Sequence, residues 1–315
     1  MEIIDCPLCR VKLYTTAYES KSLQFVLCSD CGLVYQNPRM SASELSVFYA
    51  ELYQATRHGV TDVETAVRRA REPGRFEKKK RRAEEIGGLL SSSSRVLEIG
   101  AGYGMLLAAI RDVTGAQVEG IEPSVFGPLV ARQAYDLVIE TCDVDAFLQK
   151  THQPYDLIVM SHVLEHLLTP RETLSALRAL LAPGGTLYLA VPNVLMPDDA
   201  PDRFFHFEHL TYFSPRTLVR VMNEAGFAVT LLEERPKELV VRAVVADIHS
   251  VSPHEWQAYL GSKEDVGFAL STHRRKYGFL SCGRKIVEWI LPHSFSGFLR
   301  KKTASILRGI GFVKQ

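Results

Sequence analysis

The 315-residue sequence has no apolar run approaching the roughly 20 residues that a membrane-spanning helix requires. Its first residues, Met1 to Asp5, contain neither a basic region nor an apolar core, so they do not resemble a secretory signal peptide. The shares of hydrophobic (46%) and charged (23%) residues are those of an ordinary soluble globular protein. We therefore expect a cytoplasmic protein, and its length indicates more than one domain.

An excess of one charge is also absent, because 37 Lys and Arg stand against 36 Asp and Glu, a net charge of +1. The overall charge gives no reason to expect a nucleic-acid partner, which would need a local basic patch. One such patch runs from Arg68 to Arg82 and contains nine basic residues against two acidic ones. It is either a phosphate- or nucleic-acid-binding face or the solvated face of a helix that leads into the main domain.

A second basic patch lies within residues 281–315, where seven basic residues and one acidic residue are interleaved with large apolar side chains. This composition is typical of helices that lie on a membrane surface. It equally fits helices whose apolar stripe packs on the rest of the protein. We expect residues 249–315 to form a helical C-terminal extension that could make peripheral contact with a membrane.

Cysteine is scarce, and four of the six cysteines form two Cys-x-x-Cys pairs with 18 residues between them. This spacing is typical of a four-thiolate zinc site, in which each pair forms a small turn that directs two sulfurs at one ion. Four sulfur ligands would leave no open coordination position, so the zinc would be structural. A redox dithiol or a disulfide pair is the alternative. The predicted ligands, in a zinc ribbon over residues 1–40, are Cys6, Cys9, Cys28 and Cys31.

The stretch from Val96 to Gly104 organises the rest of the chain. A short apolar run ends in glycines at positions 100, 102 and 104, which predicts a buried strand, a tight turn and then a helix. Glycines permit positive φ and let a ligand approach the backbone, and the start of the helix offers unpaired N–H groups to an anion. The stretch is typical either of a nucleotide-like ligand site or of a plain strand–helix turn.

Strands alternate with helices from residue 95 to residue 248, which predicts a parallel sheet with helices on both faces. The last strand follows its neighbour after a short link, so we expect it to be antiparallel. This domain, residues 89–248, follows a helical connector over residues 41–88. The predicted strands are Arg95–Gly100, Gln117–Glu122, Leu137–Ile139, Asp156–Ser161, Thr186–Pro192, Phe227–Glu233 and Leu239–Ile248. The predicted helices are 104–113, 124–134, 143–150, 171–182 and 215–225.

Further residues lie where a nucleotide would meet such a sheet. Glu122 ends the second strand, 22 residues after Gly100, where a carboxylate can accept hydrogen bonds from ribose hydroxyls. Asp143 follows the third strand and can receive an adenine amino group. The spacing Gly-x-Gly-x-Gly differs from the Gly-x-Gly-x-x-Gly of a dinucleotide site. The fourth strand ends in His162-Val-Leu-Glu-His166, and Pro183-Gly-Gly185 forms a turn before the fifth.

Taken together, this ordered set resembles the class I S-adenosylmethionine-dependent methyltransferases. The resemblance implies an α/β, Rossmann-like sheet of seven strands and the cofactor S-adenosyl-L-methionine. It implies that Glu98 helps to place the cofactor's amino end, that Glu122 holds the ribose and that Asp143 meets the adenine. The cofactor-binding residues implied in this way are Glu98, Gly100, Ala101, Gly102, Gly104, Glu122, Pro123, Asp143, Val144, Ser161 and His162.

A narrower resemblance joins the cysteine pattern and Asn37-Pro38 to this core. It is to bacterial small-molecule methyltransferases that carry a zinc ribbon, among them the deoxysugar C-methyltransferases. Those enzymes have a Glu-His pair after the fifth strand, and this chain has Glu208-His209 in that region. The resemblance implies that a base acts from this pair, so we expect His209 to remove the acceptor's proton and Glu208 to orient it or share the role. His206 is our third candidate for a catalytic residue. His206 stands where those enzymes have a tyrosine, and we find no counterpart of their long second domain.

The sequence therefore predicts a methyltransferase that methylates an oxygen or carbon atom of a small molecule, such as a sugar or glycan-pathway metabolite. Methyl transfer from a sulfonium is an in-line displacement, and a histidine near neutral pKa can take the acceptor's proton. For residues 206–209 the alternative is a packing role in the loop before the helix at Ser214. Two alternatives remain for the whole protein: an RNA methyltransferase that uses the zinc ribbon and residues 68–82, and a non-catalytic scaffold of the same fold.

Overall fold

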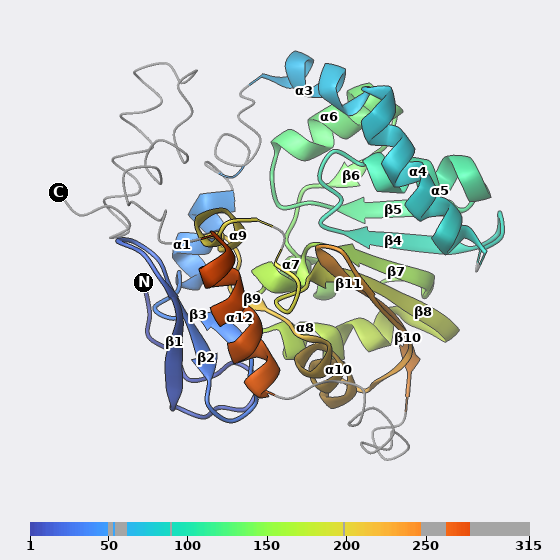
Figure 1. The fold of residues 1–315 in the computed structure, drawn as a ribbon. Helices are drawn as coiled ribbons and strands as arrows, with labels where there is room; N and C mark the ends of the chain where they lie inside the picture. The colour runs from blue at the N-terminus through green and yellow to red at the C-terminus, as the bar shows by residue number, and fades with distance from the viewer. Residues whose placement is uncertain (50–52, 54–61, 89, 198, 247–262, 278–315) are drawn as a thin grey trace.

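The computed structural model describes residues 1–49, 53, 62–88, 90–197, 199–246 and 263–277. They form two β-sheets, one of seven strands and one of four, with helices packed around the larger sheet (Figure 1). Within these residues, no helix combines the length and the apolar character that crossing a membrane would require. The helices predicted in the basic stretch 281–315 lie outside the described residues.

The larger sheet has the strand order β10-β11-β8-β7-β4-β5-β6. β11 is antiparallel to both β8 and β10, as predicted, while β4, β5, β6, β7 and β8 pair in parallel. The strands are β4 (Arg95–Ile99), β5 (Gln117–Ile121), β6 (Ile139–Glu140), β7 (Tyr155–Ser161), β8 (Leu181–Pro192), β10 (Phe227–Arg235) and β11 (Glu238–Val245). This arrangement confirms the Rossmann-like seven-stranded sheet of class I methyltransferases.

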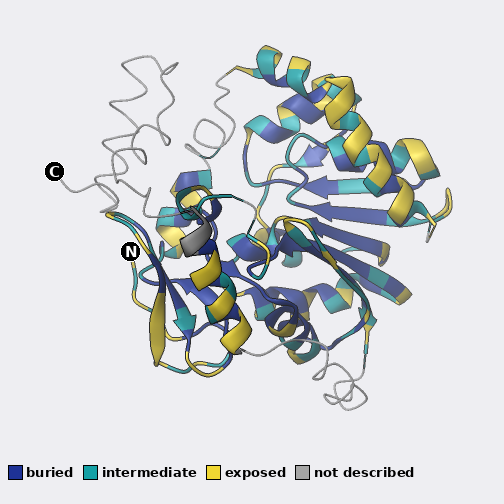
Figure 2. Ribbon diagram, in the orientation of Figure 1, coloured by how far each residue is buried: buried dark blue, intermediate teal, exposed yellow. Residues whose placement is uncertain are grey.

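Helices cover both faces of this sheet, because its central strands are apolar on both sides. In β7, Leu157 and Val159 pack towards α4 and α5, whereas Ile158 and Met160 pack towards α7, α8 and α10. Figure 2 shows these strands as buried, while the covering helices expose their outer faces. The helices are α4 (Pro73–Gly87), α5 (Met105–Thr114), α6 (Phe126–Tyr135), α7 (Val144–Leu148), α8 (Pro170–Leu177) and α10 (Pro215–Glu224).

The connector contains several helices. α1 (Ala42–Val47) begins at a capping box formed by Ser41 and Glu44. Within the predicted helical connector, residues 50–52 and 54–61 lie outside the described residues. The basic patch is divided between α3 (Val63–Ala70) and α4, and α4 begins at Pro73 because proline suits the first helical position.

The four-stranded sheet joins the N-terminal module to the main domain. Its order is β1 (Tyr14–Glu19), β2 (Gln24–Cys28), β3 (Val34–Gln36) and β9 (Thr211–Tyr212), with every pair antiparallel. Pairing of β1 with β2 begins at Tyr14, and the preceding Leu13 is 71% exposed. Since β9 follows His209 closely, the N-terminal sheet ends beside the predicted catalytic residues.

Two predictions are wrong in detail. The helix predicted over 171–182 ends at Leu177 and is followed by a 3-10 turn (Arg178–Leu180), because Leu181 already belongs to β8. The turn predicted at Pro183-Gly-Gly185 lies within β8, where the partners of β7 jump from Leu181 to Thr186. In the predicted C-terminal extension, α12 (Lys263–Tyr277) packs beside the short helix α9 (Pro201–Phe204).

Candidate active site

A cavity of about 560 Å³ opens at the carboxyl ends of the parallel strands. Open α/β sheets bind ligands at this edge. Residues that follow β4, β5, β6 and β7 form one side of the cavity, and α1 with Tyr49 and Tyr53 forms the opposite wall. The predicted cofactor residues that line it are Gly100, Glu122, Pro123, Asp143, Val144 and His162.

The glycine turn after β4 has the backbone that its sequence predicts. Gly100, Gly102 and Gly104 all have positive φ, at 68°, 54° and 71°. A Cβ on Gly100 would lie 2.5 Å from a methyl carbon of Val163, whereas a Cβ on Gly102 would have no atom within 4 Å. The turn is therefore packed tightly on one side and open at Gly102. Ala101, between these glycines, is 8% exposed.

Glu122 links the end of β5 to this turn. Its carboxylate accepts hydrogen bonds from the backbone N–H groups of Gly102 (3.0 Å) and Ser124 (3.2 Å). Burial raises the pKa of Glu122, and these hydrogen bonds act in the opposite direction. The same carboxylate lines the cavity, so it can also accept hydrogen bonds from a ligand's hydroxyl groups.

Glu98 lies on β4 and is 4% exposed. Burial raises the pKa of its carboxyl group to about 8, although the nearby ammonium of Lys79 favours the ionised form. Its Oε2 is buried and has no hydrogen-bond partner among the described residues. Oε2 of Glu98 is therefore an acceptor that a hydrogen-bond donor or a cation could satisfy, although Glu98 does not line the cavity.

Two further predicted residues have partners within the protein. Asp143 accepts a hydrogen bond from the backbone N–H of Ala146 (2.7 Å) and thereby caps α7, while it also lines the cavity. Ser161 lies at the end of β7 and does not line the cavity. Its hydroxyl accepts a hydrogen bond from Arg82 (3.1 Å).

A second cavity, of about 430 Å³, meets the first at Tyr53, His162 and His166, which line both. Of the predicted catalytic residues, His206 and His209 line this second cavity. Glu208 lines neither cavity and is 2% exposed. The other lining residues are Pro192, Asp199, Arg203, Phe204, Tyr212 and Lys237.

His162 lies between the two cavities with an unusual backbone, φ 58°, that side chains rarely adopt. Its Nδ1 is 3.3 Å from a carboxylate oxygen of Glu165, and its Nε2 is 3.2 Å from one of Glu238. Burial opposes its protonation, yet the two carboxylates raise the pKa of His162 to about 9. His162 is therefore an imidazolium at neutral pH. Sequence reasoning missed Glu238, since only the folded β10–β11 hairpin brings it here.

Part of the basic patch is used inside this network. Arg82 on α4 pairs with Glu238, and it donates to Ser161 as described above. Arg71 donates hydrogen bonds to the backbone oxygens of Gln133 and Ala134 at the end of α6. These two arginines attach α3 and α4 to the main domain. Their role therefore differs both from a phosphate- or nucleic-acid-binding face and from a fully solvated helix face.

Three side chains that can each bind a proton or a metal ion through a lone pair lie near the junction of the cavities. A carboxylate oxygen of Glu165 and one ring nitrogen each of His166 and His209 lie within 4.8 Å of one another. The Nδ1 of His166 is 2.9 Å from the backbone oxygen of Glu208 and 2.8 Å from the hydroxyl of Tyr49. This group could share a proton or hold a divalent cation. The sequence signal for His166 was its place in the His-Val-Leu-Glu-His run.

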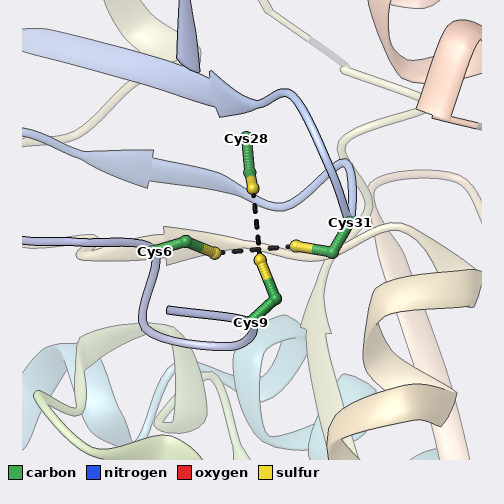
Figure 3. A group of neighbouring side chains, drawn as sticks. All are labelled: Cys6, Cys9, Cys28 and Cys31. Atoms are coloured by element: carbon green, nitrogen blue, oxygen red, sulfur yellow. Dashed lines mark hydrogen bonds between the residues drawn. The ribbon is translucent and has the colours of Figure 1, made fainter. Parts of the chain in front are cut away.

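The four predicted metal ligands converge on one point (Figure 3). The sulfurs of Cys6 and Cys31 are 3.6 Å apart, those of Cys9 and Cys28 are 3.4 Å apart, and all four lie within 4.8 Å of one another. Four sulfurs at about 2.3 Å from a tetrahedral zinc ion would be about 3.8 Å apart. The four thiols are free, which excludes the disulfide alternative in this structure, and their geometry is compatible with a zinc ion.

Comparison with known proteins agrees with this fold. The model of a family described as "Methyltransferase domain" matches residues 69–232, slightly more than half of the chain. The ubiquinone biosynthesis O-methyltransferase of Aeromonas salmonicida is 26% identical over 211 residues, which are 62% of this chain and 82% of that protein. The C-methyltransferase NovU of Streptomyces niveus is 29% identical over 154 residues, which are 46% of this chain and 35% of that protein.

Among solved structures, the CcbJ methyltransferase of Streptomyces caelestis aligns with 64% of this chain and 99% of its own, at 16% identity and a TM-score of 0.48. The family model covers the glycine turn, the three acidic residues predicted to bind the cofactor (Glu98, Glu122 and Asp143) and the histidines of the second cavity. The match to the family model, the seven-stranded sheet and the cavity at its carboxyl edge together assign the chain to a family. It belongs to the class I S-adenosylmethionine-dependent methyltransferases and is an enzyme.

Proposed function

We propose that this enzyme transfers a methyl group to an oxygen or carbon atom of a sugar or glycan-pathway metabolite bound in the second cavity, with His209 as the base. The observation that carries this proposal is the junction of the two cavities at Tyr53, His162 and His166. A methyl donor in the first cavity and an acceptor in the second would meet there, as an in-line displacement requires.

Residues in and beside the first cavity fit the cofactor. Gly102 leaves open space above the backbone, Glu98 offers a buried oxygen to a cation, and Glu122 offers a carboxylate to hydroxyl groups. Asp143 also lines the cavity, and there it would meet the adenine. When bound, the cofactor supplies an electrophilic methyl group on a sulfonium, and the walls of the cavity exclude water from it.

The surroundings of His209 support its role as a base. It is 6% exposed, it lines the second cavity, and its Nδ1 is held 2.9 Å from the hydroxyl of Tyr212. Nε2 would take the acceptor's proton as the methyl group is transferred. The ring of His206 lies 4.9 Å from that of His209, and Nδ1 of His166 lies 2.9 Å from the backbone oxygen of Glu208.

The polar lining of the second cavity supports a polyhydroxylated acceptor. Asp199, Arg203 and Lys237 can all make hydrogen bonds to hydroxyl or anionic groups. The resemblance to deoxysugar C-methyltransferases points to a sugar, and a C-methyltransferase and O-methyltransferases are both among the relatives. The sugar is therefore the acceptor class that we propose, with oxygen or carbon as the acceptor atom.

Comparing the metabolites of cells with and without the protein would supply an acceptor for assay with the purified enzyme. His209→Gln should reduce turnover roughly 10²–10⁴-fold and leave the calorimetric affinity for S-adenosylmethionine within about twofold. His152→Gln is the matched control, because His152 stacks on Phe147 and lines neither cavity. Unchanged turnover in His209→Gln would contradict the role of His209, and a wild type that does not bind the cofactor would contradict the function itself.

The RNA alternative gains little support, because Arg71 and Arg82 of the basic patch are bonded to other parts of the protein. An RNA grip would give RNA binding that falls steeply with salt, and we expect none. We retain peripheral membrane contact through residues 281–315 as a proposal. Co-sedimentation with anionic vesicles should be lost when the chain is truncated at about residue 280, and equal sedimentation of both forms would reject it.

A further inference from the structure

The hydroxyl of Tyr212 lies at the centre of a small hydrogen-bond network on the wall of the second cavity. It is 2.5 Å from the backbone oxygen of Phe204, 3.0 Å from the backbone nitrogen of His206 and 2.9 Å from Nδ1 of His209. Tyr212 is 1% exposed and His209 is 6% exposed. The geometry of these three contacts determines where the protons lie.

A phenol hydroxyl has one proton to donate and two lone pairs to accept with. The backbone oxygen of Phe204 can only accept, so the Tyr212 proton points to it. The backbone N–H of His206 can only donate, so it occupies one lone pair. The contact with His209 must then use the other lone pair, which means that Nδ1 of His209 carries a proton and donates it. In the neutral ring, Nε2 is consequently the nitrogen that accepts a proton.

The N-terminal module holds Tyr212 in this position. β9, which contains Tyr212, pairs with β3, and Val34 is the partner of Tyr212. The end of β3 also holds the preceding loop, since the backbone and side-chain nitrogens of Gln36 donate to the backbone oxygens of Leu210 (2.9 Å) and Phe207 (3.2 Å).

Aromatic packing completes this attachment. The Tyr212 ring lies edge-on to Phe25 of β2, with centroids 5.3 Å apart, and Phe205 stacks on Tyr18 of β1 at 4.7 Å. The loop that carries the proposed base is therefore built on the N-terminal sheet.

We infer that Tyr212 is the positioning residue for His209: it fixes the ring with Nδ1 protonated and Nε2 as the base, and the N-terminal sheet fixes Tyr212. Only the role of His209 as a base rests on the proposed function. The tautomer of the His209 ring and the attachment of its loop to the N-terminal sheet are properties of the protein alone. The four-cysteine module thereby has a specific task in the acceptor site, which is to hold the residue that orients His209.

The test needs no acceptor. In ¹⁵N-histidine-labelled full-length protein, the His209 signals are identified by their loss in His209→Gln. At a pH where the ring is neutral, wild type should show a pyrrole-like Nδ1 and a pyridine-like Nε2. Tyr212→Phe removes the lone pair that accepts the Nδ1 proton, so the tautomer protonated at Nε2 should become populated. Tyr35→Phe is the matched control, because Tyr35 lies on the neighbouring strand and its buried hydroxyl has no hydrogen-bond partner among the described residues.

Both tyrosine variants should bind S-adenosylmethionine within about twofold of wild type by calorimetry, which verifies folding. If Tyr212→Phe fails to fold, Gln36→Met tests the attachment of the loop to the N-terminal sheet instead. In this variant the amide hydrogens of residues 206–213 should exchange at least tenfold faster, while those of β4 and α5 stay protected. A wild-type ring protonated at Nε2, or an unchanged tautomer in Tyr212→Phe, would overturn the inference. A confirmed tautomer together with an active His209→Gln enzyme would leave the positioning intact and reject the proposed base.

Discussion

At the scale of single residues, the cofactor side of the site depends on glycines and on carboxylates held out of water. Gly100 lies so close to Val163 that any side chain would displace it, whereas Gly102 has a positive φ, which glycine adopts freely, and open space beside it. A substitution at Gly102 would therefore strain the backbone and would also fill the open space. A comparison with a glycine that has the same backbone and the same open space outside the site separates the effect on the fold from the effect on the ligand.

Gly184 provides that comparison, since it has φ 78°, a Cβ added to it would meet no atom within 4 Å, and it lies far from the glycine turn in sequence. Gly102→Ala and Gly184→Ala should each cost about 1–2 kcal/mol of unfolding free energy, measured by denaturant titration. Only Gly102→Ala should weaken binding of S-adenosylmethionine, by about tenfold or more in calorimetry, because the new methyl group would occupy the ligand's space. Equal affinities in the two variants would show that no ligand approaches Gly102.

At the scale of elements, the pairing of β3 with β9 couples the cysteine module to the acceptor loop. Cys6, Cys28, Cys31 and Tyr35 belong to the same buried cluster as residues of β4, β7 and α10. The module therefore shares one hydrophobic core with the methyltransferase domain, and a metal that stabilises the module would also stabilise residues 206–213.

Metal removal tests this coupling. Elemental analysis should find one zinc ion per chain, and Cys28→Ser or a strong chelator should remove it. Hydrogen exchange should then accelerate in β1–β3 and in residues 206–213 together, while β4, β5 and α5 keep their protection. Cys142→Ser is the control, because Cys142 stands apart from the four-cysteine cluster, and its metal content should match that of wild type. Faster exchange confined to residues 1–40 would contradict the coupling.

Much of these elements could be predicted from the sequence, because local patterns determine them. Apolar runs bounded by glycine or acidic residues predicted the seven strands, and the cysteine spacing predicted a cluster that the structure confirms. β9 could not be predicted, since it has two residues and exists only through its pairing with β3. The same holds for Glu238 and Arg82, whose meeting with His162 depends on long-range folding. The cofactor side is a continuous motif, whereas the acceptor side is assembled from distant segments.

At the scale of the whole molecule, a buried acid links stability to cofactor binding. Folding raises the pKa of Glu98 from its ordinary value of 4.5 to about 8, because the folded protein buries the carboxyl group. The folded state therefore holds this proton more tightly than the unfolded state does. Folding stability must fall as pH rises between these two values, and the loss should be complete above pH 8.

Glu98→Gln should remove this fall, so that the variant gains on the order of 2–4 kcal/mol of stability relative to wild type between pH 4.5 and pH 8.5. Thermal and urea unfolding of the ligand-free protein across this range would measure it. Glu84→Gln, an exposed substitution on α4, should leave the pH dependence as in wild type. The same Glu98 variant should bind S-adenosylmethionine more weakly at pH 8, and parallel pH curves for Glu98→Gln and wild type would contradict the raised pKa.

The pairing of β3 with β9 also has a consequence for synthesis on the ribosome. Val34 and its partner Tyr212 are about 180 residues apart, which at about 5–20 residues per second is a delay of about 10–40 s. During that interval the nascent chain holds β3 as an open sheet edge, which is a template for wrong pairing. The cysteine turns can close around a metal as soon as residue 31 has emerged. Early metal capture would thus keep the nascent module in register until the strand that completes it is made.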